Sequence, residues 1–403
     1  MRENYPVYKL RDLVSDKSED SEQIASDVKA GSNVWFLRLK DIESHAGVLI
    51  HKNIVGSLAD VTGSFDFFSP KCVLISRLRP NLNKVIIPAS AGVANKEIIA
   101  LYPVANEERP LDRNYLAYLL RSEKFLNDVS KSVTGTTLPR MNIQWLLEYR
   151  VALPPLEVQL KTVEILRECQ IAVEASRNSI KKAEGLVDAC YANNFLKGGI
   201  NKDLWEKVEL DEALSVEAGR TPKVSMVNTP RQPNEMGVLK VSAVSSGLFK
   251  ESENKRITGG EIEKFLEVKK GELLFSRANT PELVGETCMV DSDITNMFLP
   301  DKIWRLKEKN NINKFYLFGL LKSKELRGAI KSRLSHSTQS MTNISLSNFK
   351  RIKFDLPPET LREKFAEDAE ALIDMGSKFR LMEKELIEIR NSVSRRFFSG
   401  VMG

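Results

Sequence analysis

The sequence predicts an α+β protein in which two tandem α/β domains are separated by two long helices that form an antiparallel coiled coil. Three observations predict it: a repeat with an offset near 200 residues, a heptad pattern near the C-terminus, and a change in each half from short β-branched runs to a long proline-free segment. A chain of 403 residues is long enough for two or three domains, each with its own core.

The internal repeat is the most informative observation. Ser76–Arg77 aligns with Ser276–Arg277, Asn142 aligns with Asn343, and all matched segments keep their order. The matches are YKLRDLV with VELDEAL, FLRLKDI (36–42) with VLKVSAV (238–244), VLISRLRPN (73–81) with ELLFSRANT (272–280), NYLAYLLRSEKF (114–125) with FYLFGLLKSKEL (315–326), TGTTLPRMNI (134–143) with SHSTQSMTNI (335–344), RVALPPLE (150–157) with KFDLPPET (353–360), and NNFLKGG (193–199) with RRFFSGV (395–401). Solenoid repeats have periods of about 20–50 residues. The chain is therefore expected to contain two copies of one domain.

Each half is expected to begin with short strands and to end with a long helix. In the first half, the runs at 73–76, 84–88 and 97–103 predict strands, and 112–131 predicts a helix. A Leu-Pro-Pro sequence then precedes each long helix, since proline suits the first helical turn. The expected parts are a domain over 1–154, a helix over 155–197, a domain over 198–356 and a helix over 357–403.

The two long helices are expected to pair with each other. In the first, Gln170, Arg177 and Glu184 interrupt the alternate row of the heptad pattern. The expected seam positions are Leu166, Val173, Ile180 and Val187 in the first helix, and Leu361, Phe365, Asp368, Leu372, Met375, Phe379, Met382, Leu386, Ile389 and Val393 in the second. Neither helix can bury such a seam alone. We expect an antiparallel rod of roughly 60 Å between the domains; the alternative is that each helix folds onto its own domain.

Basic charge is concentrated in the globular parts. The chain has a net charge of +6, whereas 155–197 carries six acidic and six basic residues and 358–396 carries nine and eight. The densest basic segment, 302–334, has ten basic residues against two acidic ones. Such clusters bind phosphates through counterion release, although most charged runs are solvated helix faces. The uneven distribution favours a nucleic-acid partner.

Motifs of common enzymes are absent from the sequence. There is no HExxH, GxGxxG, GxSxG or Gly-Lys, and only three histidines are present. The four cysteines are widely spaced, which predicts free thiols and no zinc site. No apolar run approaches the roughly 18–20 residues of a membrane helix, and the first residues lack the apolar stretch of a signal peptide. We therefore expect a cytoplasmic protein without catalytic activity.

Three segments resemble the DNA-specificity subunit of type I restriction–modification systems. They are GELLFSRAN (271–279), Gly219–Arg220–Thr221–Pro222, and TTLPRMNI (136–143) followed by ALPPLEVQ (152–159), and the resemblance covers nearly the whole chain. Val158 stands where the family usually has Glu, PPETLREK lacks the family's Glu-Gln pair, and the first copy has no clear Gly-x-Thr-Pro. The resemblance implies two target-recognition domains, each followed by a helix of the antiparallel coiled coil.

The resemblance also implies the partners. Such a subunit binds double-stranded DNA and two methyltransferase (modification) subunits, and can join two restriction/translocase subunits. S-adenosylmethionine, ATP and Mg are expected in those partners, and no cofactor, metal or membrane contact is expected here. Two alternatives are a coiled-coil assembly scaffold without DNA readout and an orphan specificity subunit of a methylation-only complex.

Loop residues are expected to read the DNA, one half of a bipartite site per domain. Base edges in the major groove carry sequence information, whereas phosphate contacts set the register. Half-sites about one helical turn, roughly 34–36 Å, apart suit two domains on one side of a duplex. The candidates are Arg77, Arg79, Asn81, Lys84, Thr136, Thr137 and Arg140 in the first domain, and Arg220, Lys223, Arg277, Asn279, Lys302, Arg305, Ser337, Thr338 and Gln339 in the second.

Some of these candidates occur at matched positions of both copies and others do not, and the two groups are expected to have different roles. Because Arg77 and Arg277 occur in both copies, they are expected to brace the strand or to contact phosphate rather than to read bases. Arg140 and Gln339 do not recur and are the better candidates for base readout. The aligned Asn142 and Asn343 are expected to form turns.

Overall fold

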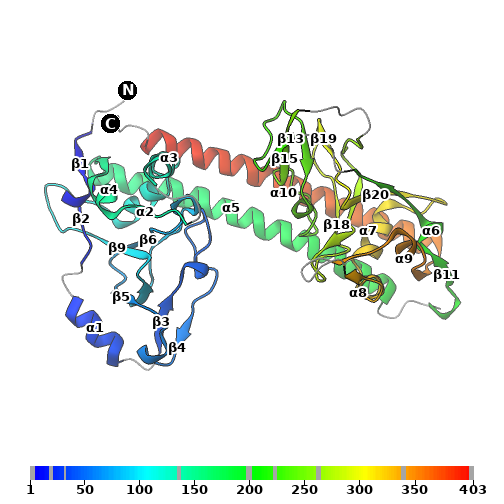
Figure 1. Ribbon diagram of the computed structural model, residues 1–403, viewed down its shortest axis with the longest axis horizontal. Coiled ribbons are helices and arrows are strands. Elements are labelled where there is room, and N and C mark those ends of the chain that lie inside the picture. Colours follow the sequence, from blue (N-terminus) through cyan, green and yellow to red (C-terminus); the bar gives the residue numbers. More distant parts are fainter. Residues whose placement is uncertain are drawn as a thin grey trace. The chain divides into compact units, whose positions relative to one another are not determined.

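The computed structural model describes residues 5–17, 21–30, 33–133, 138–196, 202–220, 225–259, 265–336 and 342–398. The chain forms two compact units: the first comprises 1–175 and 383–403, and the second comprises 176–382. Helices α5 (Leu156–Tyr191) and α10 (Glu359–Phe398) each contribute one part to each unit (Figure 1). The unit boundaries therefore fall inside the long helices, and the four-part division expected from the sequence stays a prediction.

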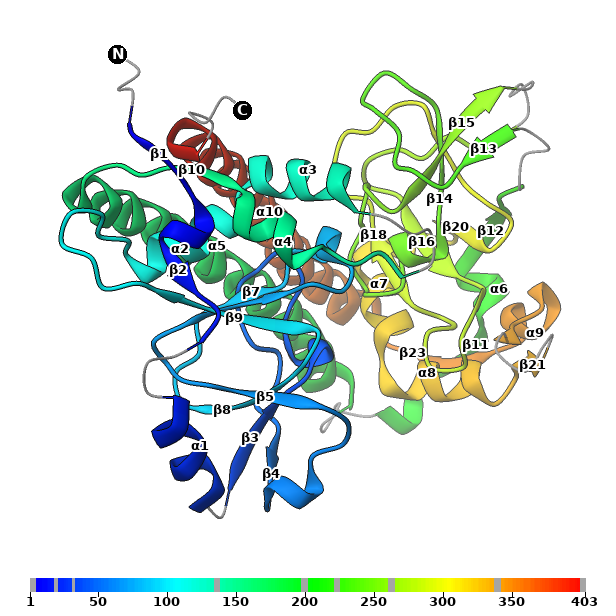
Figure 2. The ribbon, with the colours of Figure 1, turned by 60° about the vertical axis from the view of Figure 1, so that its left-hand side comes forward.

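The first unit contains two four-stranded sheets, in the orders β2-β9-β6-β7 and β4-β3-β8-β5, and the pair β1-β10 (Figure 2). All pairings are antiparallel except that of β3 with β8. Besides α5 and α10, its elements are β1 (Val7–Lys9), β2 (Val14–Ser15), α1 (Ser21–Ala30), β3 (Val34–Leu37), β4 (Ile54–Val55), β5 (Phe65–Phe68), β6 (Val73–Ser76), β7 (Val85–Ile86), β8 (Gly92–Asn95), β9 (Ile98–Pro103), α2 (Arg113–Arg121), α3 (Glu123–Ser132), α4 (Ile143–Glu148) and β10 (Arg150–Ala152).

The second unit repeats this plan. Its sheets have the orders β12-β20-β16-β18 and β13-β15-β14-β19, with the pair β11-β23 and a small sheet β17-β22-β21. The elements are β11 (Glu206–Glu209), α6 (Leu210–Ala213), β12 (Leu214–Ala218), β13 (Ser225–Val227), β14 (Gly237–Leu239), β15 (Asn254–Gly259), β16 (Leu273–Ser276), β17 (Ala278–Asn279), β18 (Thr287–Met289), β19 (Met297–Phe298), β20 (Ile303–Glu308), α7 (Lys314–Lys322), α8 (Lys324–Lys331), β21 (Ser335–His336), β22 (Thr342–Asn343), α9 (Leu346–Lys350) and β23 (Lys353–Leu356).

Equivalent elements make equivalent contacts, which confirms the repeat. The single parallel pairing of the first unit, β3 with β8, has its counterpart in β14 with β19. At the start of α5, the buried Gln159 donates from Nε2 to the carbonyl of Pro154, which precedes the helix, at 2.9 Å. At the start of α10, the buried Arg362 donates from Nε to the carbonyl of Pro357, which precedes the helix, at 3.0 Å. Two different side chains thus perform the same task at the start of each long helix.

The helix expected over 112–131 is two helices, α2 and α3. Ser122 has ψ of 149°, outside the helical range, and its side chain accepts a hydrogen bond from the Phe125 backbone. Ser323 does the same between α7 and α8, accepting from Leu326. A serine that caps a new helix ends the preceding one, because its extended backbone cannot continue the helical ladder. The hydrophobic periodicity on both sides concealed this break.

The long helices pair in antiparallel fashion within each unit. In the first unit, Arg390 of α10 donates to the Gln170 side chain of α5 at 2.9 Å. In the second, the hydroxyl of Ser176 donates to the Phe379 carbonyl at 2.7 Å, and the rings of Tyr191 and Phe365 lie 5.5 Å apart. Residue numbers rise along α5 as they fall along α10, which confirms the expected antiparallel pairing.

The expected seam is right for α5 and partly wrong for α10. The four α5 seam residues are all buried. In α10, by contrast, Asp368, Met375, Met382 and Ile389 are exposed, the last two by 50% and 53%. A neighbouring row that includes Ala366, Ala369 and Gly376 faces inward instead. These small residues permit a close approach between helices, which a count of large hydrophobic residues does not detect.

Three expected absences can be compared with the structure. All four cysteines are free thiols. Within the described residues, no cluster of three or more potential metal ligands occurs. No described helix has the length and hydropathy needed to cross a membrane.

Candidate nucleic-acid interface

The candidate site begins where the central strand of each unit ends. All four residues of β6 and of β16 are buried, so each strand is fixed in the core. The next residues are Arg77 and Arg277, which are partly exposed. The Arg77 backbone donates to the Glu97 carbonyl at 2.8 Å, and the Arg277 backbone donates to the Lys302 carbonyl at 3.0 Å. Residues 97 and 302 therefore occupy equivalent positions, immediately before β9 and β20.

In the first unit, three charged side chains form one cluster. Arg140 donates from Nε to the Glu97 carboxylate at 3.0 Å, and Nε of Arg77 lies 3.8 Å from the other carboxylate oxygen. The side chains of Arg77, Glu97 and Arg140 are 32%, 26% and 47% exposed. Glu97 thus holds two arginines side by side at the surface, and the cluster has a net positive charge.

In the second unit, the same backbone positions carry different side chains. Arg277 donates from Nε to the Asp301 carbonyl at 2.9 Å, and its guanidinium lies 5.9 Å from the Trp304 ring centroid. Lys302 stands where the first unit has Glu97. The cluster therefore contains two cations and no carboxylate at the equivalent position.

The loop that precedes α4 in the first unit, and the equivalent segment that precedes α9 in the second, lie beside the same clusters. Their backbone contacts correct the alignment of the two copies. The Met141 backbone donates to the Arg77 carbonyl, and the Ile344 backbone donates to the Arg277 carbonyl, at 2.8 and 3.0 Å. Asn343 is therefore the structural equivalent of Arg140. The sequence alignment of Asn142 with Asn343 was wrong by two residues.

The two asparagines consequently have different roles. Asn142 caps α4 by accepting from the Gln144 backbone at 2.8 Å, which confirms its expected turn-forming role. Ser345 performs this task for α9, accepting from Asn348 at 3.1 Å. Asn343 lies in β22 and pairs with Ala278, so the turn expected there was wrong. Glu97 and Asn343 are the members of the clusters that sequence reasoning missed. Only the register of the paired strands, which the sequence does not reveal, identifies these two residues.

A tight loop after β6 presents two candidates to solvent. Arg79 and Asn83 have left-handed backbones, with φ of 49° and 48°, on either side of a single 3-10 turn. The side chains of Arg79 and Asn81 are exposed. Lys84 instead points inward and donates to the Leu39 carbonyl at 2.6 Å, and burial lowers its pKa despite the opposing charge of Asp41. Lys84 therefore braces the domain.

Arg220 and Asn279 lie near the second cluster. Ala218, the last residue of β12, pairs with Trp304 of β20, so Arg220 follows the strand at the end of the sheet where Lys302 lies. A Cβ at Gly219 would lie 2.6 Å from the Leu299 carbonyl oxygen, which explains the glycine beside the exposed Arg220. Asn279 donates to the Ser245 hydroxyl at 2.8 Å.

The structure corrects the expectation that Arg305 contacts DNA. Arg305 is 7% exposed, and its guanidinium forms ion pairs with Glu217 and Glu272 at 3.1 and 3.0 Å and donates to the Glu267 carbonyl. Its charge is already used inside the unit, so the structure contradicts its selection as a DNA contact.

Much of the basic segment 302–334 is neutralised in the same way. Within this segment, Lys307, Lys309, Lys322 and Arg327 pair with carboxylates from other parts of the second unit. The local charge excess in the sequence therefore overstates the positive charge available to a partner. Six candidates lie outside the described residues: Thr136, Thr137, Lys223, Ser337, Thr338 and Gln339.

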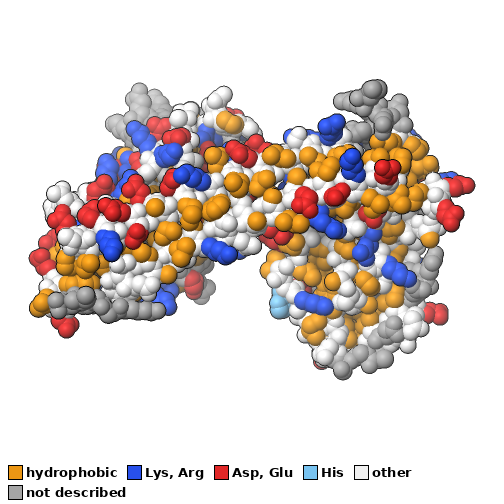
Figure 3. Space-filling view, turned by 180° about the vertical axis from the view of Figure 1, so that it is seen from behind, with side chains coloured by type: hydrophobic (Ala, Val, Ile, Leu, Met, Phe, Trp, Pro, Cys, Tyr) orange, Lys and Arg blue, Asp and Glu red, His pale blue; other side chains and the backbone are white. Residues whose placement is uncertain are grey.

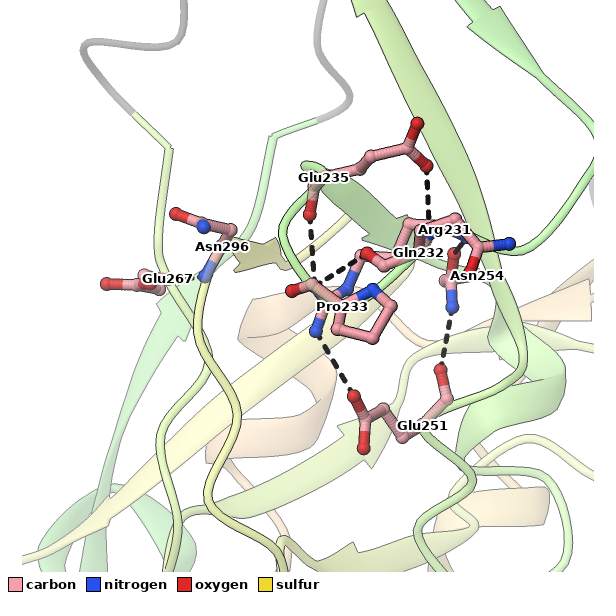
Figure 4. A network of polar contacts seen from close by, with 8 residues as sticks. All are labelled: Arg231, Gln232, Pro233, Glu235, Glu251, Asn254, Glu267 and Asn296. Carbon is pink, nitrogen blue, oxygen red and sulfur yellow. Dashed lines mark hydrogen bonds and ion pairs between the residues drawn. The ribbon is translucent and has the colours of Figure 1, made fainter.

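Another arginine that sequence reasoning did not select has an internal role (Figure 4). The side chain of Arg231 is 4% exposed and donates to the Pro233 and Glu235 carbonyls at 2.8 and 3.0 Å. It also forms an ion pair with Glu251 at 3.1 Å. A Cβ at Gly237 would lie 2.8 Å from its Cδ atom. Arg231 thus organises the loop that precedes β14.

Comparison with known proteins agrees with the duplicated architecture. The family model of the type I restriction modification DNA specificity domain matches residues 3–184 and, again, residues 202–391. The chain belongs to this family. It consists of two type I specificity domains, and each match includes a whole cluster and most of one long helix.

Individual members of the family are more distant. The specificity subunit of the type I restriction enzyme EcoEI from Escherichia coli is 28% identical over 163 residues, which are 40% of this chain and 27% of that protein. The match thus spans about a quarter of that relative's length. A solved type I restriction–modification S subunit from M. genitalium has a TM-score of 0.53 at 14% identity, covering 98% of this chain and 96% of that one. A chain from a structural study of complex assembly and conformational transition of the type I R-M system has a TM-score of 0.53 at 16% identity, covering 99% and 98%. At these identities, the two structures establish a shared fold.

Proposed function

We propose that this chain is the sequence-specific DNA-binding subunit of a type I restriction–modification complex, with each specificity domain reading one half of a bipartite site. The observation that carries the proposal is the pair of equivalent clusters. Their backbone frameworks agree, but Glu97 and Arg140 in the first are replaced by Lys302 and Asn343 in the second. Two domains that read different half-sites need a common framework with different side chains at the reading positions.

The shared and differing positions divide the work of recognition. Arg77 and Arg277 are common to both clusters and suit contacts with phosphates, which position the protein without reading sequence. The side chains that differ suit base edges: arginine pairs with guanine, and asparagine pairs with adenine. The exposed Arg79 and Asn81 extend the reading surface of the first domain.

The exposed faces of α5 and α10 are the proposed docking surfaces for methyltransferase subunits. Large apolar side chains are exposed there, at Leu160 and Ile171 of α5 and at Met375, Met382 and Ile389 of α10. Apolar side chains also recur along the long helices in the space-filling view (Figure 3). Exposed apolar surface of this kind favours protein partners. Two methyltransferase subunits, one per repeat, suit a duplicated chain.

Catalysis is assigned to the partner subunits. S-adenosylmethionine would be bound by the methyltransferases, and ATP and Mg by restriction/translocase subunits where these are present. A chain of this kind recognises the DNA sequence and provides the scaffold on which the catalytic subunits assemble.

Genome-wide mapping of methylated adenine tests the proposal. A host that expresses this chain with its methyltransferase should methylate a motif with two specified halves and an unread spacer. The double variant Glu97→Lys, Arg140→Asn, which gives the first cluster the side chains of the second, should alter one half only. The matched variant Lys302→Glu, Asn343→Arg should alter the other half. Changes in both halves from either variant, or a continuous motif, would contradict the proposal.

Binding experiments distinguish this function from the two alternatives, an assembly scaffold and an orphan specificity subunit. An assembly scaffold would show no salt-dependent binding to duplex DNA in complex with its partners. An orphan subunit of a methylation-only complex would bind and direct methylation but would not co-purify with a restriction subunit. The pair of dissimilar clusters favours DNA readout over the scaffold.

A further inference from the structure

A cavity in the first unit is separate from the proposed DNA-reading cluster. It has a volume of about 290 Å³ and lies between the loop at His45, helices α2 and α3, and the facing parts of α5 and α10. Arg121 of α2 and Arg390 of α10 line it, together with Tyr118 and Gln170. Two guanidinium groups from different helices therefore line one open cavity with a mixed polar and apolar wall.

Arg121 has no ion-pair partner among the described residues. Its Nε donates to the Ala117 carbonyl at 3.1 Å, and its guanidinium lies 4.4 Å from the centroid of the Tyr118 ring. Glu123, which also lines the cavity, forms an ion pair with Arg395 at 2.9 Å instead. Burial lowers the pKa of Arg121, and the nearby charge of Arg390 lowers it further despite the opposing effect of Tyr118. A partly buried cation without a counter-ion is less favourable than a paired one, so an anion in the cavity would stabilise the site.

The loop at Gly47 fixes the position of the Arg121 guanidinium. Gly47 has φ of +72°, and a Cβ at this residue would overlap the Nη1 atom of Arg121. The backbone of the loop therefore lies directly against the guanidinium. This contact limits the orientations open to the arginine at the cavity wall, and such a limit favours ligand binding.

The second unit shows that this architecture does not require an uncompensated cation. Gly247 has φ of +73°, close to that of Gly47. Lys322, which precedes the capping Ser323 as Arg121 precedes Ser122, forms an ion pair with Asp188 of α5 at 3.1 Å. The equivalent cation of the second unit is thus neutralised by the chain itself. Among the described residues, the cation at this position lacks an ion pair in the first unit and has one in the second.

We propose that this cavity binds an oxyanion of the phosphate class, with Arg121 as its main ligand. The planar fork of arginine matches the spacing of two phosphate oxygens and can donate two hydrogen bonds at once. The side chains of Tyr118 and Gln170 offer further polar groups at the wall. The phosphate could belong to a small soluble molecule or to the DNA backbone, because both present the same chemistry. The inference does not depend on the proposed function.

Isothermal titration calorimetry of the full-length chain tests the proposal, with inorganic phosphate and pyrophosphate as probes in chloride buffer of matched ionic strength. We expect saturable binding that Arg121→Gln weakens at least tenfold. Lys322→Gln, the matched change in the second unit, should leave binding unchanged. Arg121→Lys keeps the charge but loses the fork and should give an intermediate affinity, which keeps the test decisive if Arg121→Gln fails to fold. Absence of saturable binding, or equal binding by wild type and Arg121→Gln, would overturn the proposal.

A second measurement identifies the source of the phosphate. If the ligand is a backbone phosphate, pyrophosphate should compete with duplex DNA, and Arg121→Gln should reduce the slope of log K against log salt by about 0.9. If the ligand is a small molecule, pyrophosphate and duplex should bind together, and the slope should be unchanged. Both results support the cavity as a phosphate site and differ only in the source.

Discussion

Replacing Glu97 by glutamine should strengthen the binding of duplex DNA by the assembled complex and make it more sensitive to salt. Glu97 holds Arg140 at 3.0 Å and lies 3.8 Å from Arg77. In the folded protein its negative charge competes with phosphates for both guanidinium groups. Removing that charge leaves two arginines, 32% and 47% exposed, free to contact the backbone of the duplex.

The expected magnitude follows from the number of charges released. Each added phosphate contact steepens the slope of log K against log salt by about 0.9, so two contacts give at most about 1.8. Between 50 and 200 mM salt, this corresponds to an additional affinity loss of about 3.5-fold for one contact and about 12-fold for two. Partly exposed ion pairs contribute roughly 0–1 kcal/mol each. The free energy of unfolding should therefore change little while the DNA binding changes clearly.

Fluorescence anisotropy with a non-specific duplex, measured across this salt range, provides the assay. Lys302→Gln is the matched comparison, since it removes a cation from the equivalent position of the second unit and should not make the slope steeper. Urea unfolding of each variant checks that the fold is retained. A folded Glu97→Gln variant with an unchanged or shallower slope would refute the assignment of the two arginines to the DNA-binding surface.

Three further predictions concern the helices and the second unit. We propose that α5 and α10 set the distance between the two specificity domains; adding one heptad to both, about 10.5 Å at 1.5 Å per residue, should then lengthen the unread spacer of the methylated motif by about three base pairs with unchanged half-sites, and an unaltered spacer would contradict this proposal. A double-mutant cycle on Gln170 and Arg390, measured by urea unfolding, should give a coupling of roughly 0.5–1.5 kcal/mol, whereas additivity would remove this pair from the contacts that set the helix register. A hydrogen bond from Lys307 lowers the pKa of Glu217; burial opposes this effect and Arg305 assists it. The ionised Glu217 therefore stabilises the folded protein fully at neutral pH, and this stabilisation is lost as pH falls through the lowered pKa. Glu217→Gln should weaken the acid dependence of stability, and an unchanged acid profile would argue against this coupling.

The site residues illustrate the reach of sequence reasoning. The recurrence of Arg77 and Arg277 is visible in the sequence, and the structure gives them equivalent backbone partners. Glu97 could not be found this way, because its importance arises from strand pairing that brings it beside Arg140, 43 positions later in the chain. Arg305 was misjudged for the related reason that its carboxylate partner Glu217 lies 88 positions away. A local count of charges cannot include partners brought together by tertiary folding.

The helices show the same division. Heptad spacing indicated that α5 and α10 would pair, because seven residues complete nearly two helical turns whatever surrounds them. Which row of α10 faces inward depended instead on how closely the helices approach, and Ala369 and Gly376 decided it in place of Met375 and Met382.

The sequence by itself determined the duplication, the alternation of α/β domains with long helices, and the Ser-Arg pair that recurs where β6 and β16 end. These are local or periodic properties, written in residue order and in hydrophobic spacing. The tertiary structure decided which charges remain available: it neutralised Arg305 and Lys322, joined Glu97 to two arginines, and left Arg121 facing a cavity without an ion-pair partner among the described residues. The physical reason is that an ionic interaction acts over a few ångströms of space, and only the folded chain fixes which residues lie within that distance.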